Sequence, residues 1–188
     1  APLDFYRIEK ALLVLCLPPC YNSSGNKISL VLEGHISVYN RFLKNRRYIM
    51  ERLGGWCWYL TDKAGLLERH RCGKWMYFFK DQAFAMSICE KAITENVCYE
   101  CKCTDMEVTG ADSGVICFYL NGDDVDNHRR VIKFMLDNGL IQKTKTGKLY
   151  NISFKFDDQT RAGEYGANFE GTIKLAQFID LNTGKWTS

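Results

Sequence analysis

The sequence predicts an α+β fold in which helices cover one face of an antiparallel sheet. Several apolar or alternating stretches follow one another without a helix between them, which is typical of antiparallel strands. Two stretches with helical periodicity and capping residues interrupt this series. This order of elements does not predict a Rossmann sheet, and no GxGxxG sequence joins a strand to a helix, so dinucleotide chemistry is not supported. The 188 residues include only 3 prolines, which argues against long linkers, and we expect a single domain over residues 1–188.

The N-terminal part, residues 1–53, is expected to form two helices. Asp4 can cap the first of them, which ends before Pro18. The second is predicted over residues 34–53, where apolar residues recur at helical spacing. Its polar face carries four cations, namely Arg41, Lys44, Arg46 and Arg47. Such a cluster is most often a solvated helix face, and the alternative is a contact with a phosphate backbone or an acidic partner.

The remaining part, residues 54–188, is expected to form the sheet and its covering helices. Four strands are predicted at residues 56–60, 73–79, 97–104 and 115–120. Asp81 can cap a helix that follows the second strand. Asp123 or Asp124 can cap a second helix, and Gly139 stands where a helix commonly ends in a left-handed residue.

A further strand is predicted within residues 151–157, where apolar and polar residues alternate. Phe154 and Phe156 would point to one face of the sheet and Lys155 to the other. The short polar residues at 157–161 then predict a turn. The tail, residues 172–186, leaves two alternatives open, which are a strand followed by a turn or a short helix at residues 175–181.

The 9 cysteines are expected to be reduced structural residues. The chain is large enough to fold without disulfides, and an odd number at irregular spacing gives no disulfide framework. Cys98, Cys101 and Cys103 suggest a metal site by their spacing, but on a strand Cys98 would point away from the other two. No second CxxC or pair of histidines completes four ligands, so neither a metal nor a cofactor is predicted.

The composition favours a soluble, cytoplasmic protein. The apolar run at residues 11–17 is shorter than the roughly 20 residues of a membrane span and ends at two prolines. Asp4 and Glu9 do not fit the basic start of a cleavable signal peptide. The chain does not begin with Met, so we expect that residues upstream are missing. The net charge of +3 neither establishes nor excludes a nucleic-acid partner.

Catalytic motifs are weak in this sequence. No GxxxxGK[ST] phosphate loop occurs, which argues against an ATPase. Two pairs of adjacent carboxylates are present, Asp123-Asp124 and Asp157-Asp158. They fit a glycosidase or a metal-dependent nuclease, but helix capping and turn formation account for them better. A hydrolase or transferase that uses Asp157, His70 or Cys72 is therefore the least favoured class.

A mixed set of aromatic and cationic residues remains as a candidate ligand surface. It comprises Trp56, Trp58, Lys74, Trp75, Lys102, Lys155, Arg161 and Tyr165. Aromatic rings stack on bases or sugars, and nearby cations neutralise phosphates. Trp75 is favoured as a core residue, whereas Lys155 is predicted to point away from the buried face of its strand.

Three separated motifs resemble one known family. They are Gly73-Lys74-Trp75-Met76, the strand and helix at residues 115–140, and Lys155-x-Asp157-x2-Thr160-x2-Gly163-x-Tyr165. Their order and spacing are similar to those of the uncharacterised family named for a basophilic-leukaemia-expressed protein, which has the fold of the cap-binding translation initiation factor. The resemblance covers about residues 56–171. It implies a curved antiparallel sheet with helices on its convex face.

The resemblance also implies a binding site on the concave face of the sheet. In the cap-binding factor a methylated guanine is held between two tryptophans, a carboxylate reads its edge and basic residues hold the phosphates. Lys102 falls near the phosphate-binding basic residue of that pattern. The loop at residues 61–72, which should supply one of the two tryptophans, contains no aromatic residue, so Trp56 or Trp58 would have to replace it.

We therefore expect a non-enzymatic binding protein that holds a nucleotide or an RNA end on its concave face. Phosphate contacts are expected from Lys74, Lys102, Lys155 and Arg161. Stacking is expected from Trp56, Trp58 or Tyr165. Asp157 and Thr160 would fix the turn that positions Lys155 and Tyr165. The alternative is a protein-interaction module, such as an adapter or a phage-type inhibitor of a nucleic-acid enzyme, that docks through the basic helix around residues 41–47.

Overall fold

The computed structural model describes residues 48–166 and 169–187. The chain divides into two units, residues 1–47 and residues 48–188, so every described residue belongs to the second unit. The helix predicted after Asp4 and residues 34–47 of the second predicted helix lie outside the described residues. So do the four cations of that helix, Arg41, Lys44, Arg46 and Arg47.

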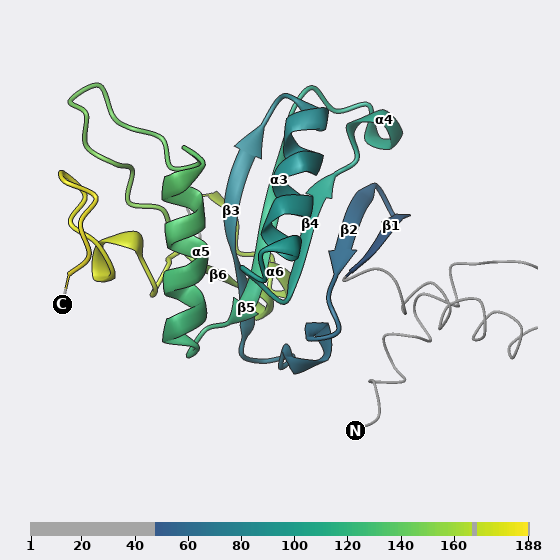
Figure 1. Cartoon of the computed structure of the whole chain (residues 1–188), viewed down its shortest axis with the longest axis horizontal. Helices are drawn as coiled ribbons and strands as arrows, with labels where there is room; N and C mark the ends of the chain where they lie inside the picture. The colour runs from purple at the N-terminus through teal and green to yellow at the C-terminus, as the bar shows by residue number, and fades with distance from the viewer. Residues whose placement is uncertain (1–47, 167–168, 188) are drawn as a thin grey trace, which may run out of the picture. The chain divides into compact units, whose positions relative to one another are not determined.

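A six-stranded antiparallel sheet forms the centre of the described region (Figure 1). Its strands are β1 Ile49–Leu53, β2 Trp56–Leu60, β3 Cys72–Phe79, β4 Glu100–Thr104, β5 Gly114–Asn121 and β6 Lys155–Phe156. Across the sheet their order is β1-β2-β4-β5-β3-β6, and every neighbouring pair is antiparallel. The predicted α+β class with an antiparallel sheet is confirmed.

Strand β1 stands where the sequence predicted the end of a helix, so the helix predicted over residues 34–53 is wrong for residues 49–53. Gly54 and Gly55 have φ angles of 59° and 78°, and the tight turn that they form places Leu53 opposite Trp56. The residues of β1 alternate between half-buried and exposed. Short apolar segments fit both helical and strand spacing, and here the glycine turn and the pairing with β2 favour the strand.

Two helices of 13 residues each cover one face of the sheet, α3 Gln82–Thr94 and α5 Val125–Asp137. Asp81 accepts a hydrogen bond from the backbone N–H of Phe84, and Asp124 accepts one from that of Asn127, so the predicted caps are confirmed. A helix of this length spans about 20 Å, which is less than a bilayer core. Within the described ranges, no helix has the length and apolar character that crossing a membrane requires.

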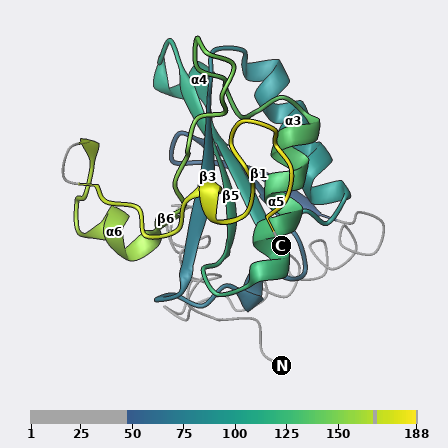
Figure 2. The ribbon, with the colours of Figure 1, turned by 90° about the vertical axis from the view of Figure 1, so that its left-hand side faces the viewer.

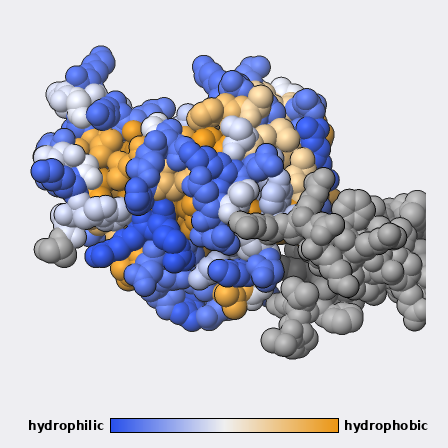
Figure 3. All heavy atoms as spheres, in the orientation of Figure 1, coloured by the Kyte–Doolittle hydropathy of each residue, from blue (hydrophilic) through white to orange (hydrophobic). Residues whose placement is uncertain are grey.

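The alternation of each strand divides its side chains between two faces of the sheet. One face packs against α3 and α5, and the opposite face carries Lys74, Lys102 and Lys155; we call this second face the lysine face. Figure 2 shows α3 and α5 on one side of the strands and the short helix α6 Asp157–Arg161 on the other. The helix-covered side exposes a mixture of hydrophilic and hydrophobic residues (Figure 3), and the lysine face lies on the far side of that view. The remaining short helices are η1 Ala64–Leu66 and α4 Met106–Thr109.

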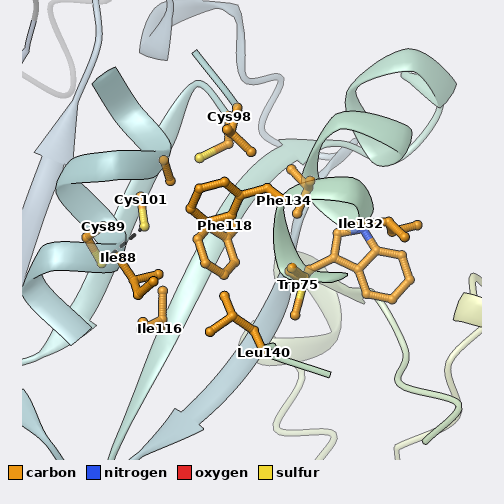
Figure 4. Packing of buried hydrophobic residues seen from close by; sticks show 14 of the residues in the cluster. Trp75, Ile88, Cys89, Cys98, Cys101, Ile116, Phe118, Ile132, Phe134 and Leu140 are labelled. Carbon is orange, nitrogen blue, oxygen red and sulfur yellow. Dashed lines mark hydrogen bonds between the residues drawn. The ribbon is translucent and has the colours of Figure 1, made fainter. Parts of the chain in front are cut away.

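The hydrophobic core lies between the sheet and helices α3 and α5 (Figure 4). Trp75 and Phe118 come from adjacent strands and are completely buried. Phe118 meets Phe134 of α5 edge to face, with 5.9 Å between the ring centroids. Cys101 of β4 and Cys89 of α3 lie with their Sγ atoms 3.3 Å apart. Strand residues of alternate positions and one stripe of each helix therefore form a single core.

The seven cysteines of the described region are all buried free thiols. Cys101 and Cys103 share the core face of β4, as predicted. Cys98 was predicted to point away from them, but it precedes β4 and joins the same core cluster. In the part of the chain that the structure describes, no group of three or more His, Cys, Asp or Glu residues could hold a metal ion. These thiols act as small apolar side chains.

The strand predicted within residues 151–157 is shorter than expected. Only Lys155 and Phe156 form β6, which pairs with the start of β3. The polar residues that follow form helix α6 instead of the predicted turn. Gln159 Oε1 accepts a hydrogen bond from the Phe156 N–H at 3.2 Å, and acidic residues in the first turn complement the helix dipole.

The C-terminal segment adopts neither of the two alternatives in full. It forms one turn of 3-10 helix, η3 Leu175–Gln177, and then a bridge between Ile179 and Trp186. Ile179 is buried, and Phe178 stacks on His128 of α5 with 5.3 Å between the ring centroids. Figure 1 shows this segment beside α5, where it completes that end of the core.

Candidate ligand-binding site on the lysine face

Three lysines from three different strands occupy the lysine face. Lys155 of β6 stands opposite Lys74 of β3, and Lys74 stands opposite Tyr119 of β5. Lys102 of β4 lies in the next row of side chains, opposite Cys117. Like charges on neighbouring strands repel each other. The surroundings of each ammonium group therefore decide what the site can bind.

Lys74 is neutralised by helix α6. Its side chain is buried, with 6% of the residue exposed. Its Nζ donates hydrogen bonds to Asp157 Oδ1 at 2.5 Å and to Thr160 Oγ1 at 2.8 Å. Asp157 and Thr160 were predicted to fix a turn that positions Lys155 and Tyr165, and they instead belong to α6 and bind Lys74 directly.

Lys155 lies under the ring of Tyr165. Only 4% of Lys155 is exposed, whereas Tyr165 is exposed. The Nζ of Lys155 donates a hydrogen bond to the backbone carbonyl of Glu164 and lies 3.7 Å from the centroid of the Tyr165 ring. Burial, together with the neighbouring Lys74 ammonium, lowers the pKa of Lys155. No carboxylate of the described residues forms an ion pair with it.

Lys102 lies half-buried against the two tryptophans of β2. Its Nζ is 4.1 Å from the ring centroid of Trp56 and 4.3 Å from that of Trp58. The ring of Tyr119 follows at 5.4 Å. The ammonium group of Lys102 forms neither a hydrogen bond nor an ion pair with any described residue. Burial lowers the pKa of Lys102, and the Lys74 ammonium acts in the same direction.

Three further residues of this face were not predicted from the sequence: Glu100, Cys117 and Tyr119. Glu100 is buried and lies two residues before Lys102, so both project from the same side of β4. Burial raises the pKa of Cys117 to about 11 and also raises the pKa of Tyr119, so both are uncharged at neutral pH. The period of two along β4 and β5 could have indicated these residues once the pairing of the strands was known.

Comparison with known proteins assigns no family to the chain. The sequence matches no protein-family model and no curated protein. The resemblance to the basophilic-leukaemia-expressed family and to the cap-binding factor therefore stays a prediction.

Trp75 does not belong to the ligand surface, so its prediction as a ligand residue is wrong. It is fully buried in the core, and its Nε1 donates a hydrogen bond to His128 Nδ1 at 2.9 Å. Successive residues of β3 point to opposite faces, so the position of Lys74 on the lysine face places Trp75 in the core. The preference for a core role was correct.

Arg161 is already neutralised in this structure. It is exposed on α6, where it forms an ion pair with Asp158. It also donates a hydrogen bond to the backbone carbonyl of Arg69 at 2.8 Å. Because a carboxylate and a carbonyl already bind its guanidinium group, Arg161 is a weaker candidate for phosphate binding than Lys102.

Of the residues considered for a hydrolase, Cys72 and Asp157 contact each other, and His70 has a different partner. The exposed His70 places its Nδ1 3.2 Å from Asp158 Oδ2. Cys72 is buried, and its Sγ lies 3.8 Å from Asp157 Oδ2. A cavity of about 270 Å³ beside His70 is lined also by Arg71, Gly122, Asp123 and Phe156. An ion pair between Arg71 and Asp123 occupies its rim, and none of the three lysines lines it.

Proposed function

We propose that the lysine face binds the phosphorylated end of a nucleotide or of an RNA strand. The observation that carries this proposal is the environment of Lys102, whose ammonium lies against Trp56 and Trp58 without a carboxylate partner among the described residues. A phosphate group would supply the anion that this ammonium lacks. A base attached to that phosphate could stack on either tryptophan ring, because every base presents a π face.

Two other buried lysines of the same face support the proposal, namely Lys74 near Lys102 and Lys155 opposite Lys74. Lys155 adds a second ammonium group whose contacts in the described region are a carbonyl and aromatic rings. Lys74 keeps its own charge paired with Asp157 and is close enough to Lys102 to affect its pKa. Charges in a protein interior are screened less than charges in water, so the Lys155 ammonium, which has no carboxylate partner among the described residues, favours an anion on this face. The proposal includes the cap-binding-factor-like curvature of the sheet that the family resemblance implies.

The test is a titration of the full chain with inorganic phosphate, guanosine triphosphate, 7-methylguanosine triphosphate and a 5′-phosphorylated RNA oligonucleotide. Isothermal calorimetry gives the affinity, and tryptophan fluorescence reports contact with Trp56 or Trp58. We expect at least one compound to bind and to change the fluorescence. Removing one charged hydrogen-bond donor should weaken binding about tenfold or more, so Lys102→Ala and Lys155→Ala should both raise the Kd.

Lys145→Ala is the matched control, because Lys145 is exposed in the loop after α5 and lies outside the lysine face. It should bind with the affinity of the unmodified chain. The proposed function is excluded if the unmodified chain binds none of the four compounds and the Lys155→Ala variant gives the same titration as the unmodified chain.

A further inference from the structure

Lys102 differs from the other two lysines of the face in what surrounds its amine. Lys74 donates to a carboxylate and to a hydroxyl, and Lys155 donates to a backbone carbonyl. The Nζ of Lys102 contacts the ring faces of Trp56, Trp58 and Tyr119 and forms no hydrogen bond with any described residue. No carboxylate, hydroxyl or carbonyl of the described residues therefore holds Lys102 in its ammonium form by a hydrogen bond, which favours the neutral amine with its lone pair.

The groups that face Lys102 come from every neighbouring element. They are the ammonium of Lys74 on β3, the carboxylates of Glu51 on β1, Glu100 on β4 and Asp157 on α6, and the thiol of Cys117 on β5. Burial and the Lys74 ammonium favour the neutral amine, whereas the carboxylates and the aromatic faces favour the ammonium. Burial is the largest of these effects, so the pKa of Lys102 is lowered.

We propose that Lys102 is a nucleophilic amine that binds a phosphorylated aldehyde covalently as an imine. After its ammonium loses a proton to solvent, the Nζ lone pair attacks the carbonyl carbon, a C–N bond forms and the carbonyl electrons move to oxygen. Protonation and loss of that oxygen as water leave a C=N bond that carries one proton on nitrogen. One ammonium and one aldehyde thus give one protonated imine, one water molecule and no change of oxidation state.

The inference that the aldehyde carries a phosphate group rests on the proposed function. Lys74 and Lys102 both approach the ring of Tyr119, at 5.5 Å and 5.4 Å from its centroid, so an anion beside Lys102 would also lie near the ammonium of Lys74, which is shared with Asp157. Trp56 and Trp58 offer ring faces for a planar aldehyde. The nucleophilic character of Lys102 does not depend on the phosphate, and the two can be measured separately.

The experiment treats the full chain with pyridoxal 5′-phosphate at neutral pH and then with sodium borohydride. Borohydride delivers hydride to the imine carbon and converts the imine to a stable secondary amine, which peptide mass spectrometry locates. A lowered pKa raises the neutral fraction of a lysine at pH 7, so we expect Lys102 to be modified faster than the exposed Lys145. Lys102→Arg, which keeps the charge, should lose this modification, while Lys145→Arg should not affect it.

The phosphate requirement is tested with pyridoxal, which lacks the phosphate group. Faster reaction with pyridoxal 5′-phosphate, slowed by inorganic phosphate, supports both the nucleophile and the anion site. Equal rates with both aldehydes, with Lys102 still preferred, retain the nucleophile and contradict the phosphate part and the proposed function. Modification of Lys102 at the rate of Lys145 overturns the inference, and circular dichroism of Lys102→Arg establishes that the variant is folded.

Discussion

Lys74 and Trp75 are adjacent in β3, but their side chains lie in opposite environments. Lys74 faces α6 across the lysine face, whereas Trp75 enters the core and donates a hydrogen bond to His128 Nδ1. The Nε2 of His128 lies 3.0 Å from the carbonyl oxygen of Gly122. One ring nitrogen therefore accepts and the other donates, which requires a neutral imidazole. Burial lowers the pKa of His128, in agreement with this pairing.

The stability of the protein should fall as His128 becomes protonated in the unfolded chain. The unfolded histidine takes up a proton near pH 6.5, and the folded one does so only at lower pH, so the unfolded state binds more protons in this window. The contribution of His128 is complete above about pH 6.5 and is lost as the pH falls toward the folded pKa, by at most about 1.4 kcal/mol per pH unit for one proton. Urea denaturation at pH 7.5, 6.5 and 5.5 measures it.

Two variants separate the effect of His128 on the pH dependence of stability from the effect of the Asp and Glu side chains. His128→Gln retains an acceptor and a donor but does not titrate, so its stability should change less between pH 7.5 and pH 5.5. His70→Gln removes an exposed imidazole that contacts Asp158 at the surface and should keep most of the pH dependence. An identical slope in His128→Gln and the unmodified chain would contradict the assignment.

At the scale of elements, β6 and α6 position the side chains that surround Lys74. Strand β6 has only two residues, and its close approach to β3 depends on Gly73, which stands opposite Phe156. A methyl group at Gly73 would lie 2.5 Å from the carbonyl oxygen of Lys155 and 2.6 Å from Cε1 of Phe154. Neither the backbone nor the buried ring can move aside without shifting β6. The absence of a side chain at Gly73 thus allows α6 to reach Lys74.

Gly73→Ala should therefore loosen the contact of β6 and α6 with β3. We expect a loss of about 1–3 kcal/mol in the free energy of unfolding, as for other overpacked sites, measured by urea denaturation. Hydrogen exchange should increase in β6 and α6 more than in β5. Gly65→Ala is the control, because a methyl group there meets nothing within 4 Å. Equal stability of the two variants would show that β6 does not depend on this close approach.

At the scale of the whole molecule, the first hairpin belongs to the sheet and not to the N-terminal part. Strand β1 carries Arg52, whose Nε lies 3.5 Å from Oδ2 of Asp105. Asp105 is almost completely buried, and this Oδ2 atom has no hydrogen-bond partner in the described region. The ion pair with Arg52 therefore compensates the buried charge of Asp105, and β1 stabilises the sheet by supplying this cation.

Two fragments should differ in stability for this reason. We expect residues 48–188, which include the whole described core, to unfold cooperatively in urea. The fragment 54–188 follows the boundary predicted from the sequence and lacks β1, so β2 loses its partner and Asp105 its cation. Leaving a buried charge unpaired costs at most about 3–5 kcal/mol, and the loss of β1 adds to this cost, so the fragment should be less stable than one that lacks the cation alone.

Arg52→Ala in the longer fragment separates the two causes. It removes the cation and keeps the strand, so its stability should lie between those of the two fragments. If the fragment 54–188 were as stable as 48–188, the boundary predicted from the sequence would be the better one.

Local patterns in the sequence were sufficient for the fold class and for several elements. Acidic caps at Asp81 and Asp124 mark where α3 and α5 begin, because a side chain that satisfies the first backbone N–H groups acts within three residues. The strict alternation around Lys155 placed it on the face opposite Phe154 for a similar reason, since the period of a strand is local. Residues 49–53 were misassigned because they fit both periods and only the pairing with β2 separates them.

The sequence by itself determined which residue types could meet on the lysine face, and the tertiary structure decided which of them do meet. Lys102, Trp56 and Trp58 come together because β2 pairs with β4, although the segments are more than 40 residues apart in the chain. Asp157 reaches Lys74 because β6 pairs with β3, and Trp75 is turned into the core by the same register. Pairing between distant strands depends on the burial of the whole core and not on local spacing, so no local pattern could have predicted which ammonium group lacks an anionic partner.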